Sequence, residues 1–150
     1  EVLQFHGREY LFYKSFPVHV GIIRGTTADP VGNLTAEDEA ITMENLEVAM
    51  AAKNSGGIVI AQVESLSNDP AAPQMVSVPG IFVDYIVVAT SRHMHPHTLF
   101  VDYDPSYSGK KRVCLEDEIA PLPLNAEKII CRRAAMEVRP GMNVNLGFGI

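Results

Sequence analysis

The stretch ENLEVAMAAKNSGGIVIAQVE, residues 44–64, decides the fold of this chain. Its first half predicts a helix, because apolar side chains recur at the spacing of one helical face after a threonine that suits an N-cap. These residues are Met43, Leu46 and Met50, with Thr42 as the N-cap. The sequence Asn-Ser-Gly-Gly at 54–57 is typical of a helix end, because Gly and Asn readily adopt the left-handed backbone conformation.

The second half of the stretch predicts a buried β-strand. Residues 58–63 are apolar on both faces except for Gln62, and they follow the helix directly. Strands that are covered on both faces have continuous apolar runs, and a helix that leads into such a strand is typical of parallel sheets. We therefore expect an α/β fold with an open, mostly parallel sheet and helices.

Another strand is expected before this unit. Val18, Val20 and Ile22 share one face of an extended segment. The sequence Asp-Pro-Val-Gly-Asn at 29–33 follows it and is typical of a tight turn, because Pro fixes φ and Gly permits positive φ. The turn predicts a short return strand near Leu34.

The remaining sequence predicts one more strand, a connection and a second helical region. Residues 81–89 are apolar except for Asp84 and predict a second buried strand. Residues 92–124 hold four of the ten prolines and show little periodicity, which is typical of a connection between two packed bodies. Helical periodicity returns after Asn125, an N-cap candidate, and Pro-Gly at 140–141 ends it. Alternating residues at 144–146 then predict a strand.

The chain is therefore predicted to hold parts of two α/β domains. Residues 1–91 are interpreted as the end of the first domain, 92–124 as the linker and 125–150 as the start of the second. The chain begins with Glu1, without an initiator Met, and it closes on a Gly-Phe-Gly turn. Both ends are interpreted as cuts in a longer protein.

Composition and charge argue against several classes of function. The formal net charge is -6, and the basic run 110–112 is followed by acidic residues, so we interpret it as a solvated loop and expect no nucleic-acid partner. No run of about 18 apolar residues is present, so no membrane span is predicted. Cys114 and Cys131 have no CxxC spacing and no secretion signal ahead of them, which indicates free thiols and a cytoplasmic location.

Three histidines at alternate positions form a candidate metal site. In an extended segment His93, His95 and His97 would share one face, and a cation could bind them. However, no Asp, Glu or Cys at suitable spacing completes the set, and Pro96 disrupts regular strand pairing. The favoured interpretation is that these histidines face solvent at a strand exit, and no metal is expected.

Two carboxylates are candidates for a nucleophile or a base. Glu64 ends the buried strand at the sheet edge where α/β proteins place catalytic groups, and Glu44 lies on the helix. The structural alternatives are a surface acid at a strand end and a first-turn acid that the helix dipole favours. The sequence has no Ser-His-Asp arrangement, Walker loop or complete GxGxxG motif. The residues alone therefore predict no complete active site.

Several stretches, in order along nearly the whole chain, resemble the class I coenzyme A transferases. The resemblance is to the single-chain acetate/propionate and 3-oxoacid CoA-transferases, in which α-type and β-type halves are fused. The stretches are GREYLFYKSFPVHVGIIRGTTADPVGNLTAEDEA, ENLEVAMAAKNSGGIVIAQVE, VPGIFVDYIVV, YDPSYSG, PLPL, KIICRRAAMEV and NVNLGFGI. The most specific parts are Ala-Asp-x-x-Gly-Asn at 28–33 and Asn-Leu-Gly-x-Gly-Ile at 145–150.

The resemblance implies a covalent route. In this family the strand that ends at the Gly-x-Gly of 147–149 opens the β-type half, and a later glutamate in an E-x-G-type motif forms an anhydride and then a glutamyl-CoA thioester. The acceptor carboxylate resolves that thioester in a ping-pong reaction. Neither Glu64 nor Glu44 is followed by the motif's glycine, so no catalytic residue is expected in this chain and the nucleophile is expected beyond residue 150. The candidates for lining the active site are Gly147, Gly149, Asn33 and Glu64.

The resemblance also implies the ligands and partners. Coenzyme A is expected as a substrate and covalent intermediate, with no permanently bound cofactor. The expected partners are an acyl-CoA, a short-chain carboxylate, the remainder of the same CoA-transferase and further copies in a homo-oligomer. As an internal fragment, the 150-residue chain alone is expected to be inactive. The alternative is a non-catalytic α/β subunit or interaction piece that needs a partner chain to complete its sheet.

Overall fold

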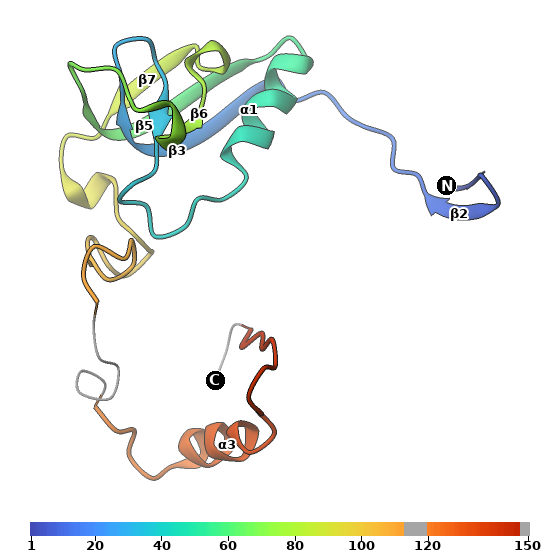
Figure 1. Ribbon diagram of the computed structural model, residues 1–150, viewed down its shortest axis with the longest axis vertical. Helices are drawn as coiled ribbons and strands as arrows, with labels where there is room; N and C mark the ends of the chain where they lie inside the picture. The colour runs from blue at the N-terminus through green and yellow to red at the C-terminus, as the bar shows by residue number, and fades with distance from the viewer. Residues whose placement is uncertain (113–119, 148–150) are drawn as a thin grey trace. The chain divides into compact units, whose positions relative to one another are not determined.

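A computed structural model describes residues 1–112 and 120–147 of the chain (Figure 1). The chain divides into two compact units, Glu1–Arg112 and Val113–Ile150, and each is described by itself. The first unit combines a β-sheet with a packed helix, which confirms the predicted α/β fold.

The first unit is built on a sheet with five strands in the described residues, in the order β6-β4-β3-β5-β7. Their bounds are β3 Val20–Ala28, β4 Leu34–Thr35, β5 Ile58–Leu66, β6 Val76–Val78 and β7 Tyr85–Val88. β3 pairs in parallel with β5, and β5 with β7, whereas β4 is antiparallel to both β3 and β6. β6 therefore runs in the same direction as β3, and only β4 is reversed, so the sheet is mixed but mostly parallel in strand direction.

One face of the sheet packs against helix α1, Asn45–Asn54. The core is aliphatic and consists of Ile23, Ala28, Leu34, Ala49, Ala52, Val59, Ala61, Val63 and Val78. Gly21 of β3 lets the helix approach closely, because a Cβ there would lie 3.2 Å from the Cβ of Ala52. Such a close approach leaves room only for small side chains between the helix and the sheet.

The predicted helix is confirmed, but its buried face and its cap are not as expected. Its buried residues are alanines, whereas Met43 and Met50 are 62% and 41% exposed. The N-cap residue is Glu44 and makes no capping hydrogen bond through its side chain, so the prediction of Thr42 as the cap is wrong. Met43 has a positive φ of 41°, which places the helix start after it.

Within the described residues, the opposite face of the sheet is covered mainly at its carboxyl end. Ile22 of β3 is 74% exposed, and all four residues of β7 are exposed. The strand predicted within residues 81–89 is present as β7, but the prediction is wrong in its burial and its bounds. A 3₁₀ turn, η2 Gly80–Phe82, precedes the strand and delays its start to Tyr85.

A β-hairpin precedes the sheet in the sequence. β1 Val2–Phe5 and β2 Arg8–Leu11 pair antiparallel. The two residues between them, His6 and Gly7, both have positive φ, as the tight turn of a two-residue hairpin requires. Two further 3₁₀ turns in this unit are η1 Pro73–Met75 and η3 Arg92–Met94.

The second unit contains helix α3, Ala126–Ala135. The Oδ1 atom of Asn125 accepts a hydrogen bond from the Lys128 backbone N–H at 2.9 Å, which confirms the predicted N-cap. The described residues after the helix form no strand, so the predicted strand at 144–146 is wrong there. An extended segment forms a strand only when a neighbour pairs with it. No helix in the described residues is long and apolar enough to cross a membrane.

The predicted domain boundaries differ from the limits of the compact units. The first unit continues to Arg112, because residues expected in the linker pack onto the sheet. The assignment of residues 1–91 and 125–150 to the α-type and β-type halves of a transferase stays a prediction.

Candidate functional site

Polar side chains gather on one face of β3 and β5, around the middle of the two strands. Arg24 and Gln62 are register partners in these two parallel strands, so their side chains are neighbours on one face. That face is opposite to α1, and each of the two residues lies between non-polar neighbours on its strand.

An ion pair and two hydrogen bonds link Arg24, Glu39, His95 and Gln62 on this face of the sheet. Glu39 Oε2 lies 2.7 Å from Arg24 Nε, and its Oε1 lies 2.8 Å from His95 Nε2. Gln62 Nε2 donates to His95 Nδ1 at 3.1 Å, so the proton of the neutral ring lies on Nε2 and is donated to Glu39. Glu39 and His95 are 8% and 1% exposed. The buried carboxylate therefore has a charge partner and a hydrogen-bond donor, as buried charges require.

Asp38 binds three residues of the segment that follows β7. Its carboxylate accepts a hydrogen bond from Ser108 Oγ at 2.7 Å and lies 3.2 Å from Arg92 Nη2 and 3.0 Å from Lys110 Nζ. Burial opposes ionisation, but the contacts with Ser108, Lys110 and Arg92 outweigh it and hold the pKa of Asp38 below its usual value. Lys110 of the basic run is exposed and lies outside any helix or strand, as expected of a solvated loop, and it also pairs with this acid.

Arg92 links Asp38 to a second carboxylate. Its Nη1 donates to Glu64 Oε2 at 2.6 Å, and its guanidinium lies 4.1 Å from the centre of the Tyr103 ring. The planar guanidinium thus contacts two acids and an aromatic face at once. In this chain Glu64 is one partner in an ion-pair network.

The turn after β3 is built around Asp29. Its Oδ1 accepts the backbone N–H groups of Val31 and Asn33, and its Oδ2 accepts Asn33 Nδ2 and the Ala71 N–H, at 2.8 to 3.1 Å. Burial opposes ionisation, but these hydrogen bonds outweigh it and hold the pKa of Asp29 below its usual value. Asn33 Oδ1 accepts the Gly80 N–H at 2.8 Å. The predicted turn and return strand are confirmed, and the turn ties β3 to two later loops.

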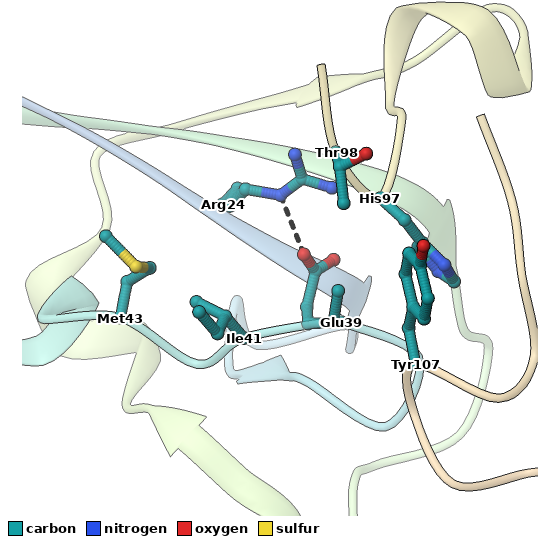
Figure 2. A pocket seen from close by; sticks show the side chains of 8 residues that line it. Arg24, Glu39, Ile41, Met43, His97, Thr98 and Tyr107 are labelled. Atoms are coloured by element: carbon teal, nitrogen blue, oxygen red, sulfur yellow. Dashed lines mark ion pairs between the residues drawn. The ribbon is translucent and has the colours of Figure 1, made fainter. Parts of the chain in front are cut away.

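A pocket of about 510 Å³ opens beside the pair of Arg24 and Glu39 (Figure 2). Its lining residues are Arg24, Glu39, Ala40, Ile41, Met43, His97, Thr98 and Tyr107. Figure 2 shows the His97 and Tyr107 rings on the side of the pocket across from Met43. His97 Nδ1 accepts the Asp104 backbone N–H at 3.1 Å, which fixes the ring. Charged head groups and apolar side chains together suit a small organic ligand.

The sequence of the chain matches a known family. Residues 1–89, more than half of the chain, match the family profile described as Coenzyme A transferase. The chain belongs to the coenzyme A transferase family. The resemblance predicted from the turn at 28–33 and the stretches around it is thereby confirmed.

Individual members of the coenzyme A transferase family align with the whole chain. It is 51% identical to the caffeate CoA-transferase of Acetobacterium woodii and 34% identical to the acetate CoA-transferase YdiF of Escherichia coli. Each alignment covers all of this chain, but only 29% and 28% of those two proteins, respectively. A crystal structure of YdiF as a thioester complex with CoA matches with a TM-score of 0.74 and 32% identity, over 93% of this chain and 27% of that one. The chain thus spans less than a third of the length of these relatives.

In this CoA-transferase chain, two of the predicted active-site residues lie in different clusters of the first unit. Glu64 belongs to the network of Arg92, whereas Asn33 belongs to the turn of Asp29. The amide nitrogen of Asn33 donates a hydrogen bond to Asp29, and its amide oxygen accepts one from the Gly80 N–H. Glu44 precedes α1 as its N-cap residue. The role of Glu64 and Asn33 in lining the active site stays a prediction.

The other two predicted active-site residues belong to the second unit. Gly147 has a φ of 67°, and its N–H donates to Asn145 Oδ1 at 2.7 Å. This left-handed conformation agrees with the bend expected of a Gly-x-Gly element. Gly149 lies outside the described residues. The role of both glycines stays a prediction.

The three histidines lie in different environments. His93 is exposed and contacts Asp102 at 3.1 Å, whereas His95 and His97 are 1% and 9% exposed. The expectation of solvent-facing histidines is therefore wrong for two of the three. The physical reason is that η3 turns the segment back onto the sheet, where His95 contacts Gln62. No group of three or more His, Cys, Asp or Glu in residues 1–112 and 120–147 could hold a metal ion.

Sequence reasoning missed the acids at 38 and 39 and their basic partners as site residues. One signal was present, since Arg24 and Gln62 are polar residues within apolar strands and such residues need buried partners. The partners could not be identified from the sequence, because His95 lies far from Glu39 along the chain. It contacts Glu39 only once the segment after β7 has folded.

Proposed function

We propose that the protein carrying this chain transfers coenzyme A between an acyl-CoA and a carboxylate. The observation that carries this proposal is the alignment of the whole chain, at 51% identity, with a protein named caffeate CoA-transferase. The family match over residues 1–89 supports the same reaction class. The alternative of a non-catalytic subunit is not favoured, because every part of the chain aligns with proteins named as transferases.

The proposed route is a ping-pong reaction through a glutamyl-CoA thioester. A glutamate oxygen attacks the thioester carbonyl carbon of the acyl-CoA and expels the CoA thiolate, which leaves a mixed anhydride. The thiolate then attacks the glutamyl carbonyl, releases the first carboxylate and forms the enzyme thioester. The acceptor carboxylate repeats the two steps in reverse order and leaves as the new acyl-CoA. The crystal structure of YdiF as a thioester complex with CoA supports this route.

We place the nucleophilic glutamate beyond residue 150 and give the described residues a scaffold role. Glu64 is paired with Arg92, and Glu39 is buried between Arg24 and His95. A carboxylate whose oxygens are held in this way is poorly placed to attack a carbonyl carbon. Neither acid is therefore assigned as the nucleophile.

The remaining parts of the proposal concern the active-site lining and the setting of the enzyme. The turn of Asn33, the acid Glu64 and the glycines at 147 and 149 are proposed to line the active site. The enzyme is proposed to be a cytoplasmic homo-oligomer in which coenzyme A is a substrate and no cofactor is permanently bound. The cysteines without disulfide spacing support the cytoplasmic location, and the family resemblance supports the homo-oligomer.

Two carboxylate classes are candidate acceptors. The 34% identical relative is named for acetate, a short-chain acid, and the 51% identical relative is named for caffeate, an aromatic acid. The test is to supply the full-length protein with butyryl-CoA and either acetate or caffeate, and to separate the CoA esters by chromatography. New acetyl-CoA or caffeoyl-CoA supports the proposal and identifies the acceptor class. No CoA transfer to either acid by folded protein would overturn it.

A further inference from the structure

Polar contacts hold the segment of residues 92–111 against the sheet. None of the buried core residues described above comes from this segment, and its Leu99 and Phe100 side chains are exposed. The contacts that join it to the rest of the first unit include those of Arg92 with Glu64 and Asp38, of Gln62 with Met94 and His95, of His95 with Glu39, and of Ser108 and Lys110 with Asp38. Because most of these contacts involve titratable groups, the docking of the segment depends on pH.

His95 is held in its neutral form by Gln62. The carbonyl oxygen of Met94 can only accept a hydrogen bond, so the Gln62 amide directs its NH₂ group toward that oxygen, at 2.8 Å. The same nitrogen lies 3.1 Å from His95 Nδ1, which therefore has to accept. A second proton on the ring would bind to Nδ1 and face this NH₂ group. Protonated His95 thus loses its contact with Gln62, or Gln62 turns its amide and loses the contact with Met94.

His97 is held in its neutral form in a similar way. Its Nδ1 accepts the backbone N–H of Asp104 at 3.1 Å, and a backbone N–H can only donate. The ring is buried, with the ring centres of Tyr103 and Tyr107 at 4.8 Å and 6.1 Å from its own. Proton uptake at Nδ1 would break the contact with Asp104 and place a charge at this buried position. Both buried histidines of the segment therefore have to stay neutral while it is docked.

The charges around the two rings only partly favour proton uptake. Glu39 attracts a proton to His95, but the guanidinium of Arg24 pairs with the same carboxylate and opposes this attraction. His97 lines the same pocket as this ion pair. On its own segment His97 interacts with the charge of Asp104, which also interacts with Lys111. Opposite charges thus face each ring.

We propose that the 92–111 segment is released from the sheet when His95 and His97 take up protons. Histidine is the side chain whose charge ordinarily changes between about pH 5 and 8. Because the released segment binds protons that the docked segment excludes, docking is favoured above this range and weakens as the pH falls through it. The contacts of Asp38 hold the pKa of its carboxyl below the usual value, so its ion pairs persist while the histidines titrate. Release takes the His97 and Tyr107 rings out of the wall of the pocket in Figure 2.

Hydrogen exchange of the full-length protein tests the release without any measurement of CoA transfer. Exchange is followed by mass spectrometry at about pH 7.5 and about pH 5.5, at equal ionic strength and after correction for the intrinsic pH dependence of exchange. Each histidine changes the docking equilibrium by up to about tenfold per pH unit. We expect the protection of amides in residues 97–111 to fall at least about tenfold at the lower pH, whereas α1 keeps its protection. Equal protection of the segment at both pH values would overturn the proposal.

Two substitutions remove the titration and keep a hydrogen bond at each site. His95→Gln keeps a donor for Glu39, and His97→Asn keeps an acceptor for the Asp104 N–H. In the double variant the loss of protection in acid is expected to disappear. His93→Gln, which removes an exposed histidine of the same segment, is expected to lose protection as the wild type does. An undiminished loss in the double variant, or a loss that His93→Gln abolishes, would contradict the assignment to His95 and His97.

A direct measurement decides the result if the double variant is unprotected at both pH values. The ¹⁵N NMR signals of the imidazoles in the full-length wild type report the protonation of each histidine. We expect His95 and His97 to be neutral rings with the proton on Nε2 at about pH 7.5, and to take up protons at the pH at which protection is lost. Proton uptake while the segment stays protected, or loss of protection while both rings stay neutral, would also overturn the proposal.

Discussion

At the scale of single residues, Asp38 decides how firmly the segment after the sheet is held. It is 5% exposed and has contacts with Ser108, Arg92 and Lys110. Asp38→Asn keeps the side-chain volume but removes the acid that pairs with Lys110 and one of the two acids that pair with Arg92. Because both cations are partly exposed, we expect the free energy of unfolding to fall by about 1–3 kcal/mol, less than for a fully buried pair. Urea unfolding measures this change.

A matched substitution tests whether burial causes that loss. Asp102→Asn removes the same charge from an exposed contact with His93. Its effect on the free energy of unfolding is expected to be within about 0.5 kcal/mol. Losses of equal size in the two variants would contradict the role given to Asp38.

Asp29 predicts how stability depends on pH. Its folded pKa lies below the usual value, so its carboxylate stabilises the folded state above the unfolded pKa, near 4, and this contribution is lost as the pH falls through the folded pKa. The protein is therefore expected to lose stability as the pH falls below about 4. Asp29→Asn should lower the free energy of unfolding at pH 7 and reduce its dependence on acid pH. Unfolding curves at several pH values test this, and an unchanged acid dependence in the variant would count against it.

At the scale of elements, the turn after β3 docks onto the loop before β7. A Cβ added to Gly80 would lie 2.2 Å from the Val31 carbonyl oxygen, a backbone atom that cannot rotate away. Gly80→Ala must therefore separate the two segments and weaken the Asn33 contact with the residue 80 N–H. We expect a loss of about 2 kcal/mol or more in the free energy of unfolding, measured by urea denaturation.

Gly21→Ala is the graded control for this prediction. A Cβ at Gly21 would lie 3.2 Å from the Ala52 Cβ, so α1 has to move by only a few tenths of an ångström. The expected loss is about 1 kcal/mol or less, because the added methyl also restricts the unfolded chain. A larger loss for Gly21→Ala than for Gly80→Ala would show that helix packing, and not the turn, limits stability.

At the scale of the whole molecule, the sequence predicts the elements better than their burial. The helix followed by β5, the turn at 29–33 and the Asn125 cap could be predicted, because each depends on local spacing and backbone chemistry. The exposure of β7 and the absence of a strand at 144–146 could not, because both depend on what covers or pairs with an apolar segment. An apolar run alone does not say which of its faces is covered.

The candidate site was less predictable for the same reason. Three alternating histidines suggested a shared face, but η3 folds the segment and buries only two of them. The link between Glu39 and His95 joins residues on separate elements, so no sequence spacing indicates it. Arg24 and Gln62 gave a local signal, as polar residues between non-polar neighbours in their strands.

The most direct test of the central claim is whether the protein forms a covalent adduct with coenzyme A. The full-length protein is incubated with an acyl-CoA in the absence of an acceptor, and its intact mass is measured. We predict a mass increase that corresponds to CoA bound as a glutamyl thioester and that disappears when acetate or caffeate is added. Transfer of CoA without any such adduct would contradict the ping-pong route, and the absence of both transfer and adduct would contradict the assignment as a CoA-transferase.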